Sequence, residues 1–199
     1  MKAADLDPRA AEVLDFWFGR PGDPEYLRAR DAWFKKDPAF DALIAQRFGT
    51  LIDAALRGEL AAWATGAPRS GLALIVVLDQ FPRNTRRGTA DMFAGDAQAL
   101  AVARALVARG DDRRLAGVER QFVYLPFEHS EALADQLECL RLFGQLEGDE
   151  PALKGLLEWA QKHHDIVERF GRFPHRNAAL GRPSTAEEIE FLKQPGSGF

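Results

Sequence analysis

One cysteine among 199 residues rules out an internal disulfide and any cysteine-based zinc cluster. Cys139 lies in the apolar helical pattern LECLRLF, which favours a buried, unreactive thiol over a nucleophile. No apolar run approaches the roughly 20 residues of a membrane-spanning helix, and acidic residues interrupt the N-terminal stretch where a signal peptide requires an apolar region. We therefore expect a cytoplasmic protein with no membrane partner.

The sequence also lacks an excess of basic residues. Its 26 Lys and Arg are outnumbered by 30 Asp and Glu, which argues against bulk attraction to nucleic acid or anionic lipid. It contains no Gly-x-Gly-x-x-Gly, no Walker loop and no Gly-x-Ser-x-Gly. We expect no nucleic-acid partner and no cofactor.

Helix signals are frequent along the chain. Asp7, Asp23 and Asp37 each precede a proline, which pairs an N-cap acceptor with the residue best tolerated at the first helical position. Apolar residues at three- and four-residue spacing predict further helices. These lie at 93–109, 117–125 (interrupted by Pro126), 130–146, 151–170 and 186–193, the last beginning with the capping boxes Ser184-x-x-Glu187 and Thr185-x-x-Glu188. With no linker, we expect one domain over 1–199 and a frayed tail at 194–199.

The longest apolar stretch is GLALIVVLDQFPRNTRR at 71–87. Its β-branched residues would suit a buried strand, but no other segment offers a partner strand, so we predict a buried helix that contains Leu74 to Leu78. The fold class is then all-α, a compact array of antiparallel helix hairpins. Tetratricopeptide-like packing is compatible with this pattern, although no 34-residue repeat can be read in the sequence.

The polar end of this stretch has an echo in RFGRFPHRN at 169–177. Both copies place Phe-Pro beside arginine and end on asparagine, and both lie in windows without acidic residues. If the two turns meet, their cations would form a pocket for a carboxylate or phosphate. The alternative is structural, with cations near helix C-termini and asparagines as caps, and we weigh it somewhat higher. The candidate ligand-binding residues are Arg83, Asn84, Arg172, His175, Arg176 and Asn177.

A second group combines Glu128, His129, Ser130 and Glu131 with His163 and His164. His164 lies on an apolar helix face, where a histidine is more often a hydrogen-bonded core residue. A carboxylate near an imidazole is nevertheless what general acid–base chemistry needs, so Glu128, His129 and His164 are the candidate catalytic residues. The group lacks the spacing of zincin and di-iron sites, so we assign no metal.

Five segments taken in order resemble the bacterial domain of unknown function 924 family. They are VLDFWFG at 13–19, WFKKDPAFDALI at 33–44, LDQFPRN at 78–84, FVYLPFEHSE at 122–131 and RFGRFPHRN at 169–177. The resemblance spans nearly the whole chain and implies an all-helical fold of the tetratricopeptide-like superfamily, but no activity. The residues that match its motifs are Arg83, Asn84, Glu128, His129, His164, Arg172, His175, Arg176 and Asn177.

Two functions are consistent with the sequence. In the first, the arginine–histidine pocket binds a small anionic ligand or an acidic peptide terminus, and His129 or His164 acts on it. In the second, the polar motifs stabilise the fold, and the protein is a helical adaptor for a protein partner.

Overall fold

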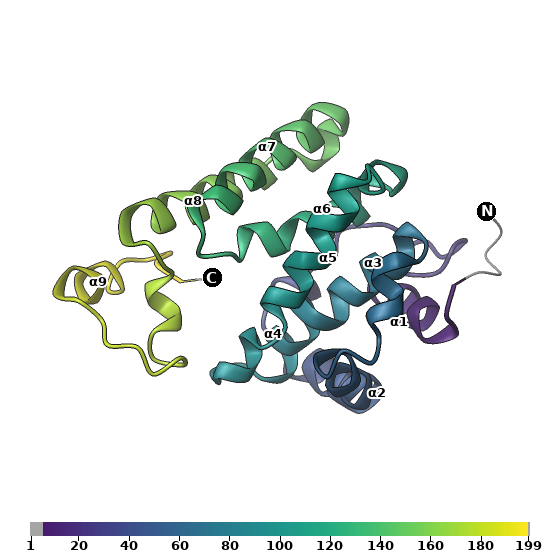
Figure 1. Ribbon diagram of the computed structural model, residues 1–199, viewed down its shortest axis with the longest axis horizontal. Coiled ribbons are helices and arrows are strands. Elements are labelled where there is room, and N and C mark those ends of the chain that lie inside the picture. Colours follow the sequence, from purple (N-terminus) through teal and green to yellow (C-terminus); the bar gives the residue numbers. More distant parts are fainter. Residues whose placement is uncertain (1–5, 199) are drawn as a thin grey trace. The chain divides into compact units, whose positions relative to one another are not determined.

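The computed structural model describes residues 6–198, and all regular structure in this range is helical (Figure 1). The all-α prediction is therefore confirmed. Tetratricopeptide-like packing stays a prediction. No helix within 6–198 is long and apolar enough to cross a membrane.

The chain divides into two compact units, which we describe separately. Unit 1 contains Met1–Arg87 and Asp91–Pro126, and unit 2 contains Gly88–Ala90 and Phe127–Phe199. The expectation of a single domain over 1–199 stays a prediction. So does the frayed tail at 194–199. Within it, the Ser197 hydroxyl donates to the Leu192 carbonyl at 3.1 Å, and Phe199 lies outside the described residues.

The helices of unit 1 begin largely where the sequence predicts. Asp7 and Asp37 both cap helices that have proline in the first turn, and the Asp37 carboxylate accepts from the backbone N–H groups of Ala39 and Phe40. The α-helices of this unit are α1 (Pro8–Phe18), α2 (Pro38–Leu56), α3 (Pro68–Ile75), α4 (Phe81–Thr85), α5 (Asp96–Ala108) and most of α6 (Gly117–Glu128).

Two predictions for this unit are wrong. Asp23 and Pro24 begin no helix. Instead the Asp23 carboxylate accepts from the Arg20 backbone N–H, and the following turn ends at Leu27, whose φ of 56° is left-handed. Pro126 does not interrupt α6, because the helix continues to Glu128. Proline removes only one backbone hydrogen bond, and the burial of Phe122 and Phe127 on either side offsets that loss.

An aromatic cluster forms the core of unit 1. The Trp17 ring lies 5.6 Å from Phe81 and 5.7 Å from Phe122 between ring centroids, both in edge-to-face arrangements. Phe48 stacks on Phe81 at 4.9 Å. Phe34 stacks on Phe122 at the edge of this cluster, but 60% of its surface is exposed.

The central apolar stretch is buried and helical, as predicted, but it is not a regular α-helix throughout. Leu74 to Leu78 are all buried, and α3 passes into a π-helical turn at η4 (Val76–Gln80). In an α-helix the Leu78 carbonyl would accept from residue 82, which is a proline without an N–H. Phe81 donates instead to Val76, five residues back. The Leu78 carbonyl faces Gly95, where an added Cβ would lie 2.1 Å from the oxygen, so this position requires glycine.

Unit 2 is built on the packing of α7 (Leu133–Asp149) against α8 (Leu156–Phe170) (Figure 1). Gly171, with φ of 67°, ends α8. The 3₁₀ turn Pro174–Arg176 follows, and α9 (Ala186–Phe191) begins with the Thr185–Glu188 capping box that the sequence predicts. Ser184 does not form the second predicted box, because its hydroxyl accepts from the Asn177 side chain.

The core of unit 2 forms where α8 meets the second Phe-Pro turn. Ile166, Val167 and Phe173 are buried together, with Phe170 and Phe191 packed against them. Trp159 does not join a core, because 52% of its surface is exposed. Cys139 is buried as predicted, and burial raises the pKa of its thiol above the ordinary range, so the group stays protonated.

Candidate functional site

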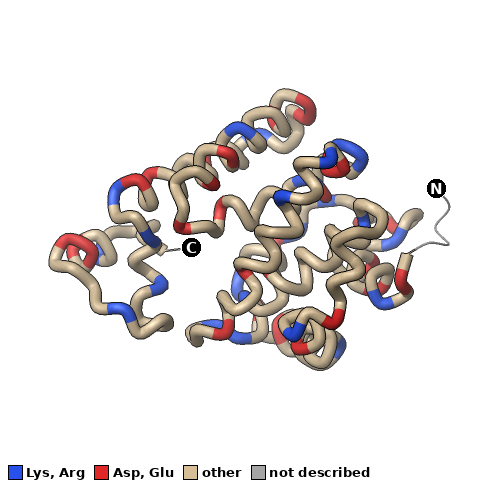
Figure 2. Tube along the Cα trace, in the orientation of Figure 1, with Lys and Arg blue, Asp and Glu red and all other residues tan. Residues whose placement is uncertain are grey.

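Basic and acidic residues are interspersed along the trace of each unit (Figure 2). Arg83, in the first Phe-Pro turn, pairs with carboxylates of its own unit. The Arg83 guanidinium donates to both carboxylate oxygens of Asp96, at 2.7 and 2.9 Å, and to the Asp79 backbone carbonyl at 2.8 Å. The buried Asp79 carboxylate lies 3.1 Å away. Burial alone would lower the pKa of Arg83, but the two carboxylates raise it. Arg83 is therefore neutralised within its own unit.

Asn84 also has its polar contacts inside unit 1. Its side-chain amide donates to Asp41 at 2.7 Å, and Arg87 donates to the same carboxylate at 3.0 Å. Asp41 lies in the first turn of α2, so this contact ties the first Phe-Pro turn to that helix. Both predicted ligand-binding residues of the first turn thus have structural partners.

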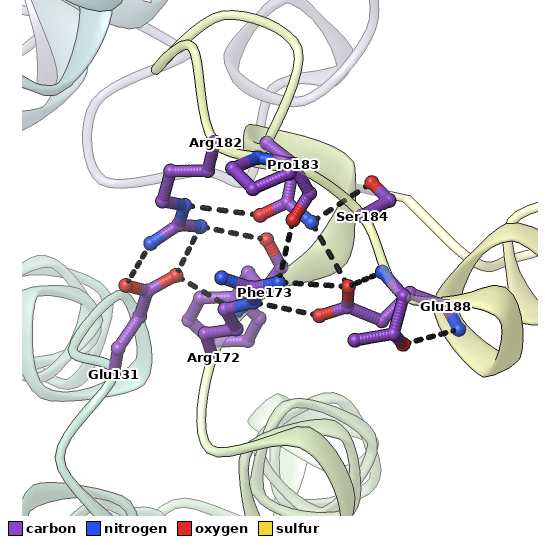
Figure 3. Close-up of polar contacts among 9 residues, drawn as sticks. Glu131, Arg172, Phe173, Arg182, Pro183, Ser184 and Glu188 are labelled. Carbon is purple, nitrogen blue, oxygen red and sulfur yellow. Dashed lines mark hydrogen bonds and ion pairs between the residues drawn. The ribbon is translucent and has the colours of Figure 1, made fainter.

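In the second Phe-Pro turn, two predicted ligand-binding residues are tied to α9 (Figure 3). Arg172 donates to both oxygens of Glu188, at 2.6 and 2.8 Å, and to the Pro183 carbonyl at 2.9 Å. The Asn177 amide donates to Ser184 at 3.0 Å and to Glu188 at 3.3 Å. The bonds from Arg172 lower the pKa of Glu188 to about 2, so this carboxylate is ionised at neutral pH.

Arg182 extends the same network to the segment before α7. It donates to both oxygens of Glu131, at 2.7 and 2.9 Å, and to the Asn177 side-chain oxygen at 3.0 Å (Figure 3). Glu131 also accepts from the Phe173 backbone N–H at 2.8 Å. The network joins segments from residues 131 to 188, so its direct role is to hold unit 2 together.

The remaining predicted residues of this turn gather around the Phe173 ring. The Arg176 guanidinium lies 4.6 Å from the ring centroid and donates to the His129 carbonyl at 2.9 Å. The His175 and His163 rings each lie 5.6 Å from Phe173. We call the set the histidine–arginine cluster, and it comprises Glu128, His129, His163, Phe173, His175 and Arg176.

His163 has a strongly shifted pKa. Its Nδ1 lies 2.9 Å from the Trp159 carbonyl, which can only accept, so Nδ1 carries the proton and Nε2 keeps its lone pair. The Glu128 carboxylate lies 3.5 Å from the same nitrogen. Burial, together with smaller contributions from the nearby His129, His175 and Arg176, lowers the pKa of His163 to about 3. The ring is therefore neutral at neutral pH.

The sequence reading singled out the neighbouring histidine instead. His164 has contacts to Asp165, 3.2 Å from its Nδ1, and to Gln161 at 3.4 Å. Ala160 and Val167 are each three or four residues away from both His163 and His164. The spacing of apolar residues therefore cannot distinguish between the two histidines. The contact that distinguishes His163 is to the backbone carbonyl of Trp159, one helical turn earlier, and any residue type would provide that carbonyl, so the sequence contains no signal for it.

The predicted meeting of the two Phe-Pro turns is not decided by these contacts. Arg83 and Asn84 belong to unit 1, and His175, Arg176 and Asn177 belong to unit 2. Within unit 2, Arg176 donates to the His129 carbonyl, and the Glu128 carboxylate lies 3.5 Å from His163. A site shared between the two turns stays a prediction.

Comparisons with known proteins identify a family of unknown function. The family profile described as "Bacterial protein of unknown function (DUF924)" matches residues 13–196. A solved structure of a protein of unknown function, ATU0120 from Agrobacterium tumefaciens, is 43% identical, with a TM-score of 0.80, and the match covers 94% of this chain and 98% of that one. No curated protein matches the sequence. The chain belongs to the bacterial DUF924 family.

Proposed function

We propose that the histidine–arginine cluster binds a small anionic ligand that carries a carboxylate or a phosphate. The observation that supports this proposal is the arrangement of cationic and imidazole groups around one phenylalanine ring. Arg176, His163 and His175 lie against Phe173, and the His129 ring lies 6.4 Å from that of His163. A guanidinium matches the geometry of carboxylate and phosphate oxygens, and imidazole N–H groups add directed donors. An acidic peptide terminus presents the same chemistry.

The proposed site contains only part of the ligand-binding set predicted from the sequence. Arg83, Asn84, Arg172 and Asn177 hold the fold through carboxylates and a hydroxyl of their own units. From the predicted set the proposal keeps His175 and Arg176, which lie against the Phe173 ring, and it adds His129, whose carbonyl accepts from Arg176. These three residues, with the neutral His163 beside them, form the proposed anion site.

Binding is better supported than catalysis. An imidazole with a pKa of about 3 is a weak base at neutral pH, so His163 is poorly suited to remove a proton. Acid–base roles for Glu128, His129 and His164 therefore stay a hypothesis drawn from the sequence.

The test is calorimetric titration with inorganic phosphate and with succinate, at constant ionic strength. We expect binding to the wild type and at least a tenfold loss of affinity in Arg176→Gln. Arg169→Gln is the matched control, because Arg169 is an exposed arginine of the same segment that pairs with Glu187. It should leave affinity unchanged.

Arg176 is buried, so a second variant guards against misfolding. His175→Asn alters a half-buried side chain and should weaken binding by a factor of about 10, which corresponds to about 1.4 kcal/mol. Circular dichroism should report unchanged helix content for each variant. Absence of binding to both anions, or equal affinities in the Arg176 and Arg169 variants, would contradict the proposal.

A helical adaptor is the second candidate, and an apolar cavity in unit 1 favours it. The cavity has a volume of about 240 Å³ and is lined mostly by small or aliphatic residues. An aliphatic or aromatic side chain of a partner helix would fit this space. The lining residues are Ala55, Gly58, Ala61, Ala64, Leu74, Leu78, Gln98, Ala101 and Val102.

Benzene is a suitable probe of this cavity, since apolar cavities in proteins bind it. Resonances of the lining residues should shift when benzene is added to the wild type. They should no longer shift in Ala64→Leu, which fills the space. If the same residues shift in both proteins, the cavity is not the binding place.

A further inference from the structure

His164, Asp165 and Glu168 form a compact triangle on α8. The pair 164 and 168 is four residues apart and the pair 165 and 168 is three apart, so each pair spans one helical turn. Their nearest ligand-capable atoms, one ring nitrogen and two carboxylate oxygens, all lie within 4.8 Å of one another. Helix geometry alone therefore brings three potential metal ligands together.

The members of this triangle differ in burial. His164 is only 8% exposed, and its Nδ1 lies 3.2 Å from a carboxylate oxygen of Asp165. Asp165 and Glu168 are exposed. The imidazole is thus held by its surroundings, whereas both carboxylates lie at the surface, where Glu168 in particular can change rotamer at little cost.

Gln161 adds an outer contact to the same triangle. Its side-chain amide donates to the Asp165 carboxylate at 2.7 Å and lies 3.4 Å from Nδ1 of His164. Such contacts orient ligand side chains in metal sites, where the residues around the ligands fix their direction.

We propose that His164, Asp165 and Glu168 bind a divalent transition-metal ion, with Zn²⁺ as the representative. One imidazole nitrogen with two carboxylates is a donor set that suits zinc and its neighbours, whereas Mg²⁺ and Ca²⁺ prefer oxygen donors alone. Zinc bonds of about 2.1 Å would place tetrahedral ligand atoms about 3.4 Å apart. Rotation of the two exposed carboxylates can supply the contraction from the observed spacing.

Three protein ligands would leave at least one coordination position open to water or to an added ligand. The ion would also link successive turns of α8, so its binding should stabilise the folded chain. This inference does not depend on the anion site, whose residues are different.

The test is calorimetric titration of the full chain with ZnCl₂, followed by thermal unfolding with and without the ion. We expect one ion per chain and a higher melting temperature. Asp165→Asn and Glu168→Gln alter exposed side chains, so both proteins should fold, and each should bind Zn²⁺ at least tenfold more weakly. Glu158→Gln removes another exposed carboxylate of α8 as the matched control and should bind as the wild type does.

MgCl₂ should give no comparable binding, which separates this donor set from general attraction of cations to acidic residues. Zinc should also shift the NMR signals of the His164 ring before those of the other histidines. The proposal is overturned if the wild type does not bind Zn²⁺, or if both triangle variants bind it with the affinity of the control.

Discussion

The two Phe-Pro turns share a motif but differ in what precedes it. Before the first turn there is no helix-ending glycine, so the helix continues through a π-turn into α4 and buries Phe81. Before the second turn Gly171 ends α8, and the chain enters a 3₁₀ turn. The same residue types are therefore placed on a continuous helix in one case and on a loop in the other.

The difference extends to the arginines. Arg83 in the first turn is enclosed by two carboxylates of the same unit. Arg176 in the second turn lies on an aromatic ring and among imidazoles. The repeated motif thus contains a structural arginine in each copy, Arg83 and Arg172, and the second copy adds a candidate binding arginine, Arg176.

The largest expected effect tests the apolar packing behind the first turn. Leu78→Ala should lower the free energy of unfolding by about 4 kcal/mol, because the side chain is fully buried in the helical stretch. Chemical denaturation measures this loss. A change below about 0.5 kcal/mol would mean that the residue faces solvent.

The next effect compares the two structural arginines directly. Arg83→Ala should lower the free energy of unfolding by about 3 kcal/mol, because it removes the half-buried guanidinium that pairs with both Asp79 and Asp96. Arg172→Ala should cost less, since its partner Glu188 is also bonded by Asn177 and by the Thr185 backbone. Urea titrations of both variants give the comparison, and a larger loss for Arg172 would reverse our ranking.

A third prediction concerns pH and the second turn. His163 has a pKa of about 3 in the folded state and an ordinary pKa of 6.5 when unfolded. Below pH 6.5 the unfolded chain therefore binds a proton that the folded chain does not. Stability should fall as the pH decreases from 6.5 towards 3, by up to about 1.4 kcal/mol per unit.

Measurements between pH 6.5 and 5 separate the effect of His163 from that of Glu188. The lowered pKa of Glu188 reduces stability only below pH 4.5, the usual pKa of a glutamate. His129, His175, Arg176 and Glu128 surround His163 and share its environment. His163→Gln should reduce the slope of stability against pH measured by denaturation. An equal slope in both proteins would assign the dependence to its neighbours.

The smallest expected effect lies at the capping box next to the second turn. Thr185→Ala should lower the free energy of unfolding by about 1 kcal/mol, because the backbone N–H of Glu188 loses its acceptor. Ser184→Ala removes an acceptor for Asn177 instead and leaves the capping box intact. Thermal unfolding of both variants separates the cap from the network.

Local features of the fold were predictable from the sequence because their partners are close in the chain. The caps at Asp7, Asp37 and Thr185 act within three residues. The errors at Asp23 and Pro126 arose where a competing side-chain contact or the burial of neighbours outweighs a local preference.

The candidate site was less predictable, because its partners are distant in the sequence. Arg83 pairs with Asp96, Asn84 with Asp41 and Arg172 with Glu188. The windows around the two turns contain no acids, so they suggested a collection of cations. The sequence shows which charges exist, but folding determines which carboxylate reaches them.

The π-turn has a consequence for the direction of the side chains beyond it. A π-turn inserts one extra residue into a helix, and one residue corresponds to about 100° of rotation about the axis. Every side chain after Gln80 therefore projects with a different phase from that of an uninterrupted α-helix. Pro82 lies at this point, and it lacks the N–H that an uninterrupted α-helix would donate to the Leu78 carbonyl. The direction in which Arg83 leaves the helix, towards Asp96, therefore depends on the π-turn that precedes it.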